Sequence, residues 1–158
     1  MRIGMITTSF PRFPGDFAGS FVYEMAAALT RRGHQVEEEV PASPPTMETH
    51  RNWKTVDGLS VFPVSYAWPA GTQKLFYGAG VIDNLFHKPW LASQIPSAVA
   101  GMTRFTLKRR HTWDSVISHW ILPSALIAGT VICNRRPHLA IAHSGDIHLL
   151  EKIPGKRA

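Results

Sequence analysis

Short apolar runs alternate with amphipathic helical patterns along nearly the whole chain, and this alternation constrains the fold more than any other feature. Five segments are predicted to be strands, at residues 3–7, 34–40, 59–66, 114–120 and 138–144. Helical periodicity is predicted at residues 20–33, 95–110, 122–136 and 146–153. Strands that alternate with helices form a parallel sheet whose faces the helices cover. The sequence therefore predicts an α/β, Rossmann-like fold with a mostly parallel sheet flanked by helices, and residues 1–158 are expected to form a single domain.

The first predicted helix has the clearest boundaries. Asp16 or Ser20 is expected to cap its amino end, and Gly33 follows its last turn, where glycine commonly ends a helix. Its apolar face is predicted from the i, i+3, i+4, i+7 spacing of Val22, Met25, Ala26 and Leu29.

Four local features refine the other elements. The three glutamates at residues 37–39 are unusual for a buried parallel strand and indicate an edge strand or an altered surface. Pro63 also indicates an edge, because proline cannot donate a ladder hydrogen bond. Ser97 is expected to cap the helix that follows it, and Pro123 is expected in the first turn of the next helix.

Polar residues, glycines and histidines follow three of the predicted strands, at residues 7–20, 118–124 and 142–148. In open parallel sheets, ligands bind outside the carboxyl ends of the strands. The three segments are therefore expected to gather along one crest of the sheet and to form the functional site.

The charge of the chain favours anionic partners. Seventeen Lys and Arg residues against eleven Asp and Glu give a net charge of +6. Such a charge suits nucleic acid, phosphorylated ligands or the acidic inner face of a membrane. For the basic clusters at residues 108–110, 135–136 and 155–157, however, the favoured interpretation is the solvated last turn of a helix, where cations suit the helix dipole.

The sequence predicts a soluble, cytoplasmic protein. The single cysteine, Cys133, cannot form an internal disulfide, which favours a reducing compartment. The longest apolar run, at residues 121–133, is shorter than the roughly 20 residues that span a bilayer. The apolar run after Arg2 is interrupted too early to be a signal peptide.

Other kinds of site fit the sequence less well. His119, His143, Asp146 and His148 match no standard spacing of metal ligands, so no bound metal is expected. Ser144 lacks the G-x-S-x-G turn of a hydrolase. No nucleic-acid-binding motif accompanies the charge. Gly15 and Gly19, spaced G-x-x-x-G, match neither a dinucleotide fingerprint nor a Walker loop, so they either admit a phosphate or sugar or simply form a turn.

Three segments, in this order, resemble motifs of one enzyme family. Residues 5–37 resemble its opening strand, glycine loop and helix that ends in R-G-H-x-V. Residues 114–128 resemble its H-x-H-W-x-L-P-S-G segment, and residues 137–152 its P-hydrophobic-V-x-T-x-H-G-x-D segment. The chain is similar to the N-terminal domain of the retaining GT-B glycosyltransferases of family 4, also called group 1.

The resemblance implies roles for particular residues. His119 is the implied catalytic residue, which would hydrogen-bond the transferred sugar or the donor phosphate, and we expect its imidazole at the rim of the cleft. The loop at residues 10–20 would border the acceptor and the donor phosphates. The implied substrate-binding residues are Phe10, Gly15, Asp16, Gly19, Ser20, Trp120, His143, Ser144 and Asp146.

The resemblance also implies an activity. The chain would be the acceptor-side domain of an enzyme that transfers sugar from a nucleotide-sugar to a hydroxyl acceptor with retention and without metal or other cofactor. The basic charge and the aromatic residues between Tyr66 and Trp90 would suit a lipid-linked or membrane-bound acceptor at the inner membrane face. Packing in a core explains these aromatic residues equally well. The donor-binding C-terminal domain and its E-x₇-E motif are not in the sequence, so the isolated chain is expected to be inactive. The alternative is a non-catalytic binding or partner domain, half of a split enzyme.

Overall fold

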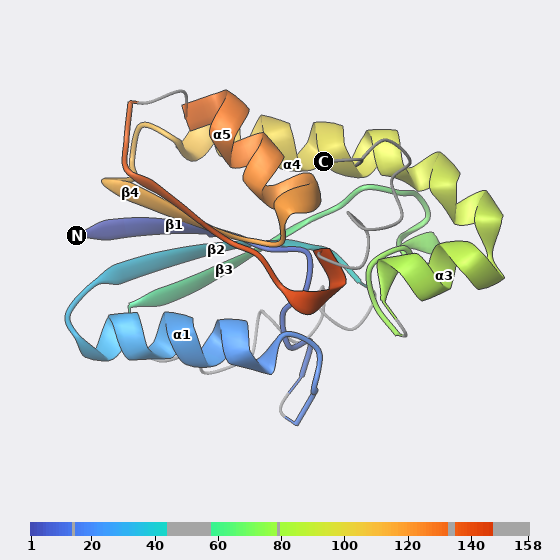
Figure 1. The fold of residues 1–158 in the computed structure, drawn as a ribbon, viewed down its shortest axis with the longest axis horizontal. Helices are drawn as coiled ribbons and strands as arrows, with labels where there is room; N and C mark the ends of the chain where they lie inside the picture. The colour runs from blue at the N-terminus through green and yellow to red at the C-terminus, as the bar shows by residue number, and fades with distance from the viewer. Residues whose placement is uncertain (14, 44–57, 79, 133–134, 147–158) are drawn as a thin grey trace, which may run out of the picture.

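A fully parallel, five-stranded sheet forms the centre of the computed structural model, which describes all residues except 14, 44–57, 79, 133–134 and 147–158 (Figure 1). The strand order is β3-β2-β1-β4-β5 and every neighbouring pair is parallel. The predicted α/β, Rossmann-like fold is therefore confirmed. The strands are β1 (Arg2–Ile6), β2 (Gln35–Pro41), β3 (Leu59–Val64), β4 (Ser115–His119) and β5 (His138–Ile141).

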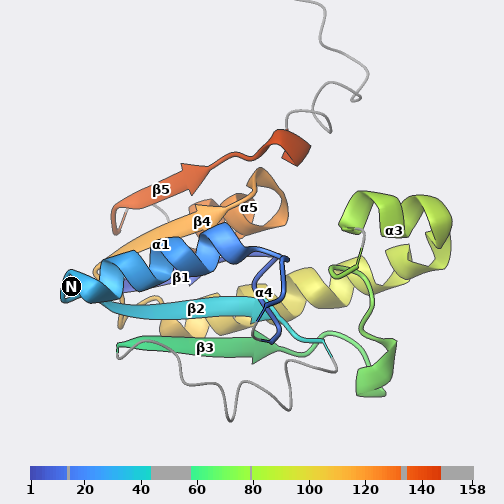
Figure 2. The ribbon, with the colours of Figure 1, turned by 90° about the horizontal axis from the view of Figure 1, so that it is seen from below.

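Helices cover both faces of the sheet. One face carries α1 (Ser20–Arg31), and the opposite face carries α4 (Ile95–Arg109) and α5 (Leu126–Ile132) (Figure 1). A further helix, α3 (Val81–His87), lies beyond the end of the sheet (Figure 2). Two 3₁₀ helices, Ala70–Thr72 and Pro89–Gln94, flank α3 in the chain.

The strand alternation divides the core into two layers. Ile3 and Met5 of β1 point to the α1 side, where they pack with Val22 and Ala26. Ile6 points to the other side and packs with residues of α4, α5 and the segment before β4, namely Met102, Ile127, Ala128, Val131 and Trp113. The predicted apolar face of α1 thus holds, with Val22 and Ala26 buried and Met25 and Leu29 partly buried.

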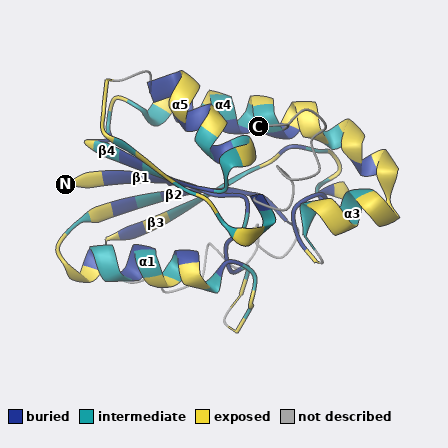
Figure 3. Ribbon diagram, viewed as in Figure 1, coloured by how far each residue is buried: buried dark blue, intermediate teal, exposed yellow. Residues whose placement is uncertain are grey.

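The segment between β3 and α4 forms a small core of its own, which the weak sequence pattern there does not reveal. Tyr66, Phe76, Tyr77 and Leu91 are buried together and pack against Ala98 at the start of α4. The helix α3 beside this cluster is mostly exposed (Figure 3). These aromatic residues therefore have a packing role.

The edge predicted for the glutamate-bearing strand is wrong. β2 is an interior strand between β1 and β3, and Glu38 and Glu39 are fully buried. The three glutamate side chains of β2 have different surroundings. Glu37 accepts hydrogen bonds from the Arg109 guanidinium and, at 2.8 Å, from Trp113 Nε1. Pro63 does lie in an edge strand, β3, as predicted.

The other two glutamates have little or no hydrogen bonding. Glu39 Oε2 accepts a 2.7 Å hydrogen bond from the Thr106 hydroxyl. Burial raises the pKa of Glu39 to about 8, although this hydrogen bond opposes the rise. Neither carboxyl oxygen of Glu38 has a partner among the described residues, and burial, followed by the nearby Glu39, raises its pKa well above the usual value. Both side chains are therefore neutral when the protein is folded near neutral pH.

The buried glutamates predict that stability falls as the pH rises from 6.5 to 8. In this window folded Glu39 holds a proton that the unfolded chain, with a pKa of about 4.3, has already lost. The free energy of unfolding should drop by about 1–2 kcal/mol for this group alone, and Glu38 acts in the same direction. His119, with its lowered pKa, has the opposite effect only below about pH 6.5. Urea unfolding at each pH measures the slope, and Glu39→Gln should flatten it; an unchanged slope in that variant contradicts the assignment.

Three predicted helix details are corrected. The N-cap of α1 is Gly19, without a side-chain cap, so neither Asp16 nor Ser20 caps it. The N-cap of α4 is Gln94, and Ser97 lies inside the helix, where its hydroxyl donates to the Gln94 carbonyl. Pro123 lies in a π-type turn, Ile121–Ala125, that precedes α5.

Two further predictions concern the last helix and a membrane span. The helix predicted at residues 146–153 lies almost entirely outside the described residues. Within the part that the structure describes, none of the helices combines the length and apolar character that a bilayer crossing demands.

Candidate functional site

The crest predicted from the sequence is formed at the carboxyl ends of β1, β4 and β5. These strands are neighbours in the sheet, so the segments that follow them emerge side by side. The loop after β1 leads into α1, and Phe21 in the first turn of α1 contacts Trp120 after β4 and His143 after β5. The sequence therefore places the three segments correctly.

A pair of histidines lies at the centre of the crest. His119 ends β4, and its Nδ1 lies 3.1 Å from Nε2 of His143, which follows β5. The two rings are stacked with a 13° angle between their planes and 5.3 Å between their centroids. Because one nitrogen must donate and the other accept, the contact requires that at least one ring be neutral.

His119 is buried, and this corrects the expectation that it lies at a cleft rim. Its side chain is only 1% exposed, because the rings of Phe21, Trp120 and His143 surround it. Its second nitrogen, Nε2, is buried without a hydrogen-bond partner among the described residues. An unsatisfied buried polar atom costs free energy, so a ligand that supplied a hydrogen bond to this nitrogen would be stabilised there.

Burial keeps the histidine pair uncharged. It lowers the pKa of His119 to about 4, and the neighbouring His143 contributes to the lowering. Burial also lowers the pKa of His143, although the Asp146 carboxylate opposes this. Near neutral pH both imidazoles are therefore neutral, which suits them to hydrogen-bond a hydroxyl or a phosphate oxygen.

Asp146 ties the segments after β4 and β5 together. Its carboxylate accepts one hydrogen bond from the backbone N–H of Ile121 at 3.0 Å and another from the backbone N–H of His143 at 2.9 Å. The side chain is buried. Asp146 therefore positions the two histidines, and its oxygens are already engaged.

The loop after β1 has the close backbone packing that requires glycine. Gly19 has φ = 66°, and a Cβ added there would meet the Ser9 carbonyl oxygen at 2.3 Å. Gly15 also has a positive φ, but its surroundings are open. Ser20 begins α1. Gly19 thus brings the start of α1 against the loop, where any other residue would be strained.

Asp16 orders this loop rather than the helix. Its carboxylate forms a bidentate pair with the Arg12 guanidinium and accepts hydrogen bonds from the backbone N–H groups of Arg12 and Ala18. Burial opposes the ionised form, yet these hydrogen bonds hold the pKa of Asp16 below its usual value. The Arg12 guanidinium also lies over the Tyr77 ring, 4.9 Å from its centroid.

The remaining predicted site residues lie in different surroundings. Phe10 is fully buried in the core beneath α1 and packs edge-on against Tyr23. Trp120 lies at the crest, with 4.6 Å between the centroids of its ring and the His143 ring. Ser144 is exposed at the end of the crest. The structure thus brings Trp120 and Ser144 to the histidine pair and places Phe10 below it.

Two crest residues were missed by the sequence analysis. Phe21 is 47% exposed and packs against His119, Trp120 and His143, with its ring 4.8 Å from that of His143. Its position two residues after Gly19, at the amino end of the first helix, was the available signal. Arg12 was missed because its pairing with Asp16 depends on the loop geometry.

The histidine pair does not form a metal site with the other described residues. No cluster of three or more His, Cys, Asp or Glu residues arranged to hold a metal ion is present in the described residues. Three of the four residues considered as metal ligands lie close together. His119 and His143 are hydrogen-bonded to each other, and the Asp146 carboxylate is hydrogen-bonded to backbone N–H groups. The fourth, His148, lies outside the described residues.

The fold and the crest define a Rossmann-like α/β domain with a neutral histidine pair at the carboxyl ends of its strands. No protein-family model and no curated protein matches the chain. Solved structures do match, and one is the C-terminal domain of a hydrogenase from Pyrococcus furiosus (14% identity, TM-score 0.56, 88% of this chain and 89% of that chain).

Two further solved structures match over most of this chain. One is a sucrose-phosphate synthase from Thermosynechococcus elongatus (14% identity, TM-score 0.55, 96% of this chain and 68% of that chain). The other is UGT2 from Phytolacca americana in complex with UDP-2-fluoro-glucose and pterostilbene (15% identity, TM-score 0.53, 89% of this chain). The chain spans 30% of the length of UGT2. At such identities the likeness is one of fold.

Proposed function

We propose that the chain is the acceptor-side, N-terminal domain of a retaining glycosyltransferase of family 4. The enzyme transfers a sugar from a nucleotide-sugar to a hydroxyl acceptor, and it needs neither a metal nor another cofactor. Its acceptor is lipid-linked, and the protein acts in the cytoplasm at the inner membrane face. Support comes from the three ordered sequence motifs and from the fold likeness to glycosyl-transferring enzymes.

The single observation that carries the proposal is the buried Nε2 of His119 beside His143, which has no hydrogen-bond partner in the part of the chain that the structure describes. A neutral imidazole can donate or accept one hydrogen bond, so Nε2 is suited to a sugar hydroxyl or a phosphate oxygen. His119 then helps catalysis if this hydrogen bond is stronger in the transition state than in the bound substrate. The Asp146 carboxylate keeps both histidine-bearing segments in place.

Access to His119 requires a side chain to move, because its ring is covered. Phe21 is the neighbour with the most freedom, since nearly half of its surface is exposed at the first turn of α1. In this proposal the sugar displaces the Phe21 ring and takes its place against His119 and Trp120. The glycine-containing loop after β1 then borders the phosphates of the donor.

Turnover by the natural polypeptide that carries these residues tests the proposal. It is incubated with UDP-, GDP-, ADP- and dTDP-sugars, a membrane-lipid extract and EDTA, and release of the nucleoside diphosphate is measured. We expect release with one donor, undiminished by EDTA, and a product whose anomeric configuration by NMR equals that of the donor.

The 158-residue chain alone is the control, and it should give a mixed α/β circular dichroism spectrum without turnover. Binding of a donor or acceptor by the natural polypeptide without any turnover contradicts the proposal and favours a non-catalytic binding or partner domain. Inversion, or a loss of activity in EDTA, contradicts the retaining, metal-free assignment.

A further inference from the structure

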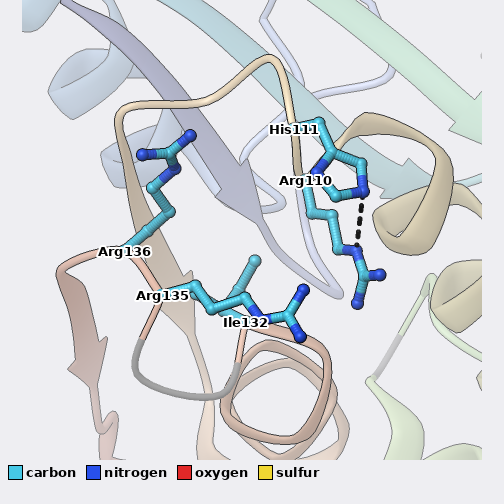
Figure 4. Close-up of a pocket in the computed structure, with 5 residues that line it drawn as sticks. All are labelled: Arg110, His111, Ile132, Arg135 and Arg136. Atoms are coloured by element: carbon cyan, nitrogen blue, oxygen red, sulfur yellow. Dashed lines mark hydrogen bonds between the residues drawn. The ribbon is translucent and has the colours of Figure 1, made fainter.

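A pocket lined mainly by basic side chains lies at the opposite end of the sheet from the crest. It has a volume of about 200 Å³ and is lined by Arg110, His111, Ile132, Arg135 and Arg136 (Figure 4). Arg110 and His111 follow α4 and precede β4, whereas Arg135 and Arg136 follow α5 and precede β5. The pocket therefore lies where the amino ends of two neighbouring strands enter the sheet.

The charge in this pocket is not compensated within it. Three arginines and one histidine line it, with the guanidinium groups of Arg110 and Arg135 on the same side of the pocket (Figure 4), and none of its described lining residues is acidic. Neither Arg135 nor Arg136 forms a side-chain hydrogen bond or an ion pair with the described residues, and both are exposed. Like charges held close together repel each other, so an anion between them would be stabilised.

The ordinary explanation for such residues accounts for only one of the three arginines. Cations at a helix end are stabilised by the carbonyl groups that remain free there. Arg110 has this role, because its Nη1 donates to the Val131 carbonyl of α5 at 3.2 Å. Its Nε also donates to Nε2 of His111, which fixes the orientation of both side chains. The side chains of Arg135 and Arg136 have no comparable contact with any residue that the structure describes.

We propose that this pocket binds a phosphate group. Guanidinium groups present paired N–H donors that match phosphate oxygens, and Arg110 is already held in place to receive one. The volume is below the roughly 300–1,000 Å³ typical of pockets for drug-sized ligands, so it suits a single phosphate rather than a whole nucleotide. The phosphate belongs either to a small soluble phosphate compound or to a lipid headgroup.

This site is independent of the proposed sugar transfer, since it uses no residue of the crest. The NMR signals of the two sites can also be told apart, because His111 lines the pocket whereas His119 and His143 lie in the crest. Binding at one end of the sheet can therefore be measured without reference to the other.

Two titrations of the histidine- and amide-labelled chain test the proposal. One uses pyrophosphate in solution, and the other uses sedimentation with vesicles of phosphatidylcholine, with or without phosphatidic acid. We expect saturable NMR shifts of His111 and of the Arg135 and Arg136 amides, or sedimentation that depends on phosphatidic acid. The double variant Arg135→Ala/Arg136→Ala should weaken this binding at least tenfold, because two charge-assisted hydrogen-bonding groups are removed.

Arg31→Ala/Arg32→Ala is the matched control, as it removes two adjacent, exposed arginines and the same charge from the end of α1. Binding should persist in this control. Response to pyrophosphate identifies a soluble ligand, and response only to phosphatidic acid identifies a headgroup. Absence of both, equal losses in the two double variants, or shifts confined to His119 and His143 would each overturn the proposal.

Discussion

Replacing His119 with alanine is expected to lower sugar transfer by the natural polypeptide about 100-fold or more. The side chain ends β4 in the middle of the crest, and its Nε2 has no hydrogen-bond partner among the described residues, so in the proposed function the substrate supplies one. Loss of a hydrogen bond that strengthens in the transition state lowers kcat and kcat/KM together. Steady-state kinetics measure both.

The same substitution should also cost stability, because the imidazole is buried. Removal of a buried ring leaves a cavity, and we expect a loss of about 1–3 kcal/mol in the free energy of unfolding. Met102→Ala is a matched control, since Met102 is buried to the same 1% exposure but packs in the core beneath α4. Near-normal turnover of His119→Ala, together with a Tm loss like that of the control, would show that His119 is a core residue only.

Replacing Glu38 with methionine is expected to raise stability by about 1–3 kcal/mol. Its carboxyl group is fully buried without a hydrogen bond to the described residues, so it costs desolvation without compensation. Methionine has a similar size and carries no such cost. For a domain of this size, the Tm should rise by several degrees.

Glu37→Met is the matched control, one position earlier on the same strand. It removes the acceptor of hydrogen bonds from Arg109 and Trp113, and it leaves the buried Trp113 N–H unpaired. We therefore expect Glu37→Met to lower the free energy of unfolding while Glu38→Met raises it. Urea titration at pH 8, where the penalty for Glu38 is largest, measures both. Destabilisation by both variants would show that the Glu38 carboxyl has a partner or a function.

The class of fold and the place of the site could be predicted because both depend on local patterns. Strand and helix alternate with clear periodicity, and the carboxyl ends of parallel strands must share one edge. His119, Trp120 and His143 could therefore be assigned to one crest before their contacts were known. Pro63 marked the edge strand β3 for an equally local reason.

What the sequence did not reveal depends on contacts between distant residues. The glutamates of β2 read as an exposed edge because the residues that accommodate two of them, Thr106 and Arg109, lie in a helix about 70 positions later. The burial of His119 follows from Phe21, which approaches it only because Gly19 lets α1 begin close to the loop. No pattern within a single segment carries this information.

Because β1 lies in the middle of the sheet, the sheet cannot be completed until late in synthesis. β1 pairs on one side with β2, the next strand to be synthesised, and on the other side with β4. Just before β4, the Asp114 carboxylate accepts a hydrogen bond from the backbone N–H of Arg2, 112 residues earlier in the chain. During translation, one side of β1 thus remains an open edge while α4 and the cluster before it emerge from the ribosome. Trp113, which fills the space over Gly4, arrives equally late. Until then the nascent protein exposes an unpaired strand edge, to which another chain could add a strand.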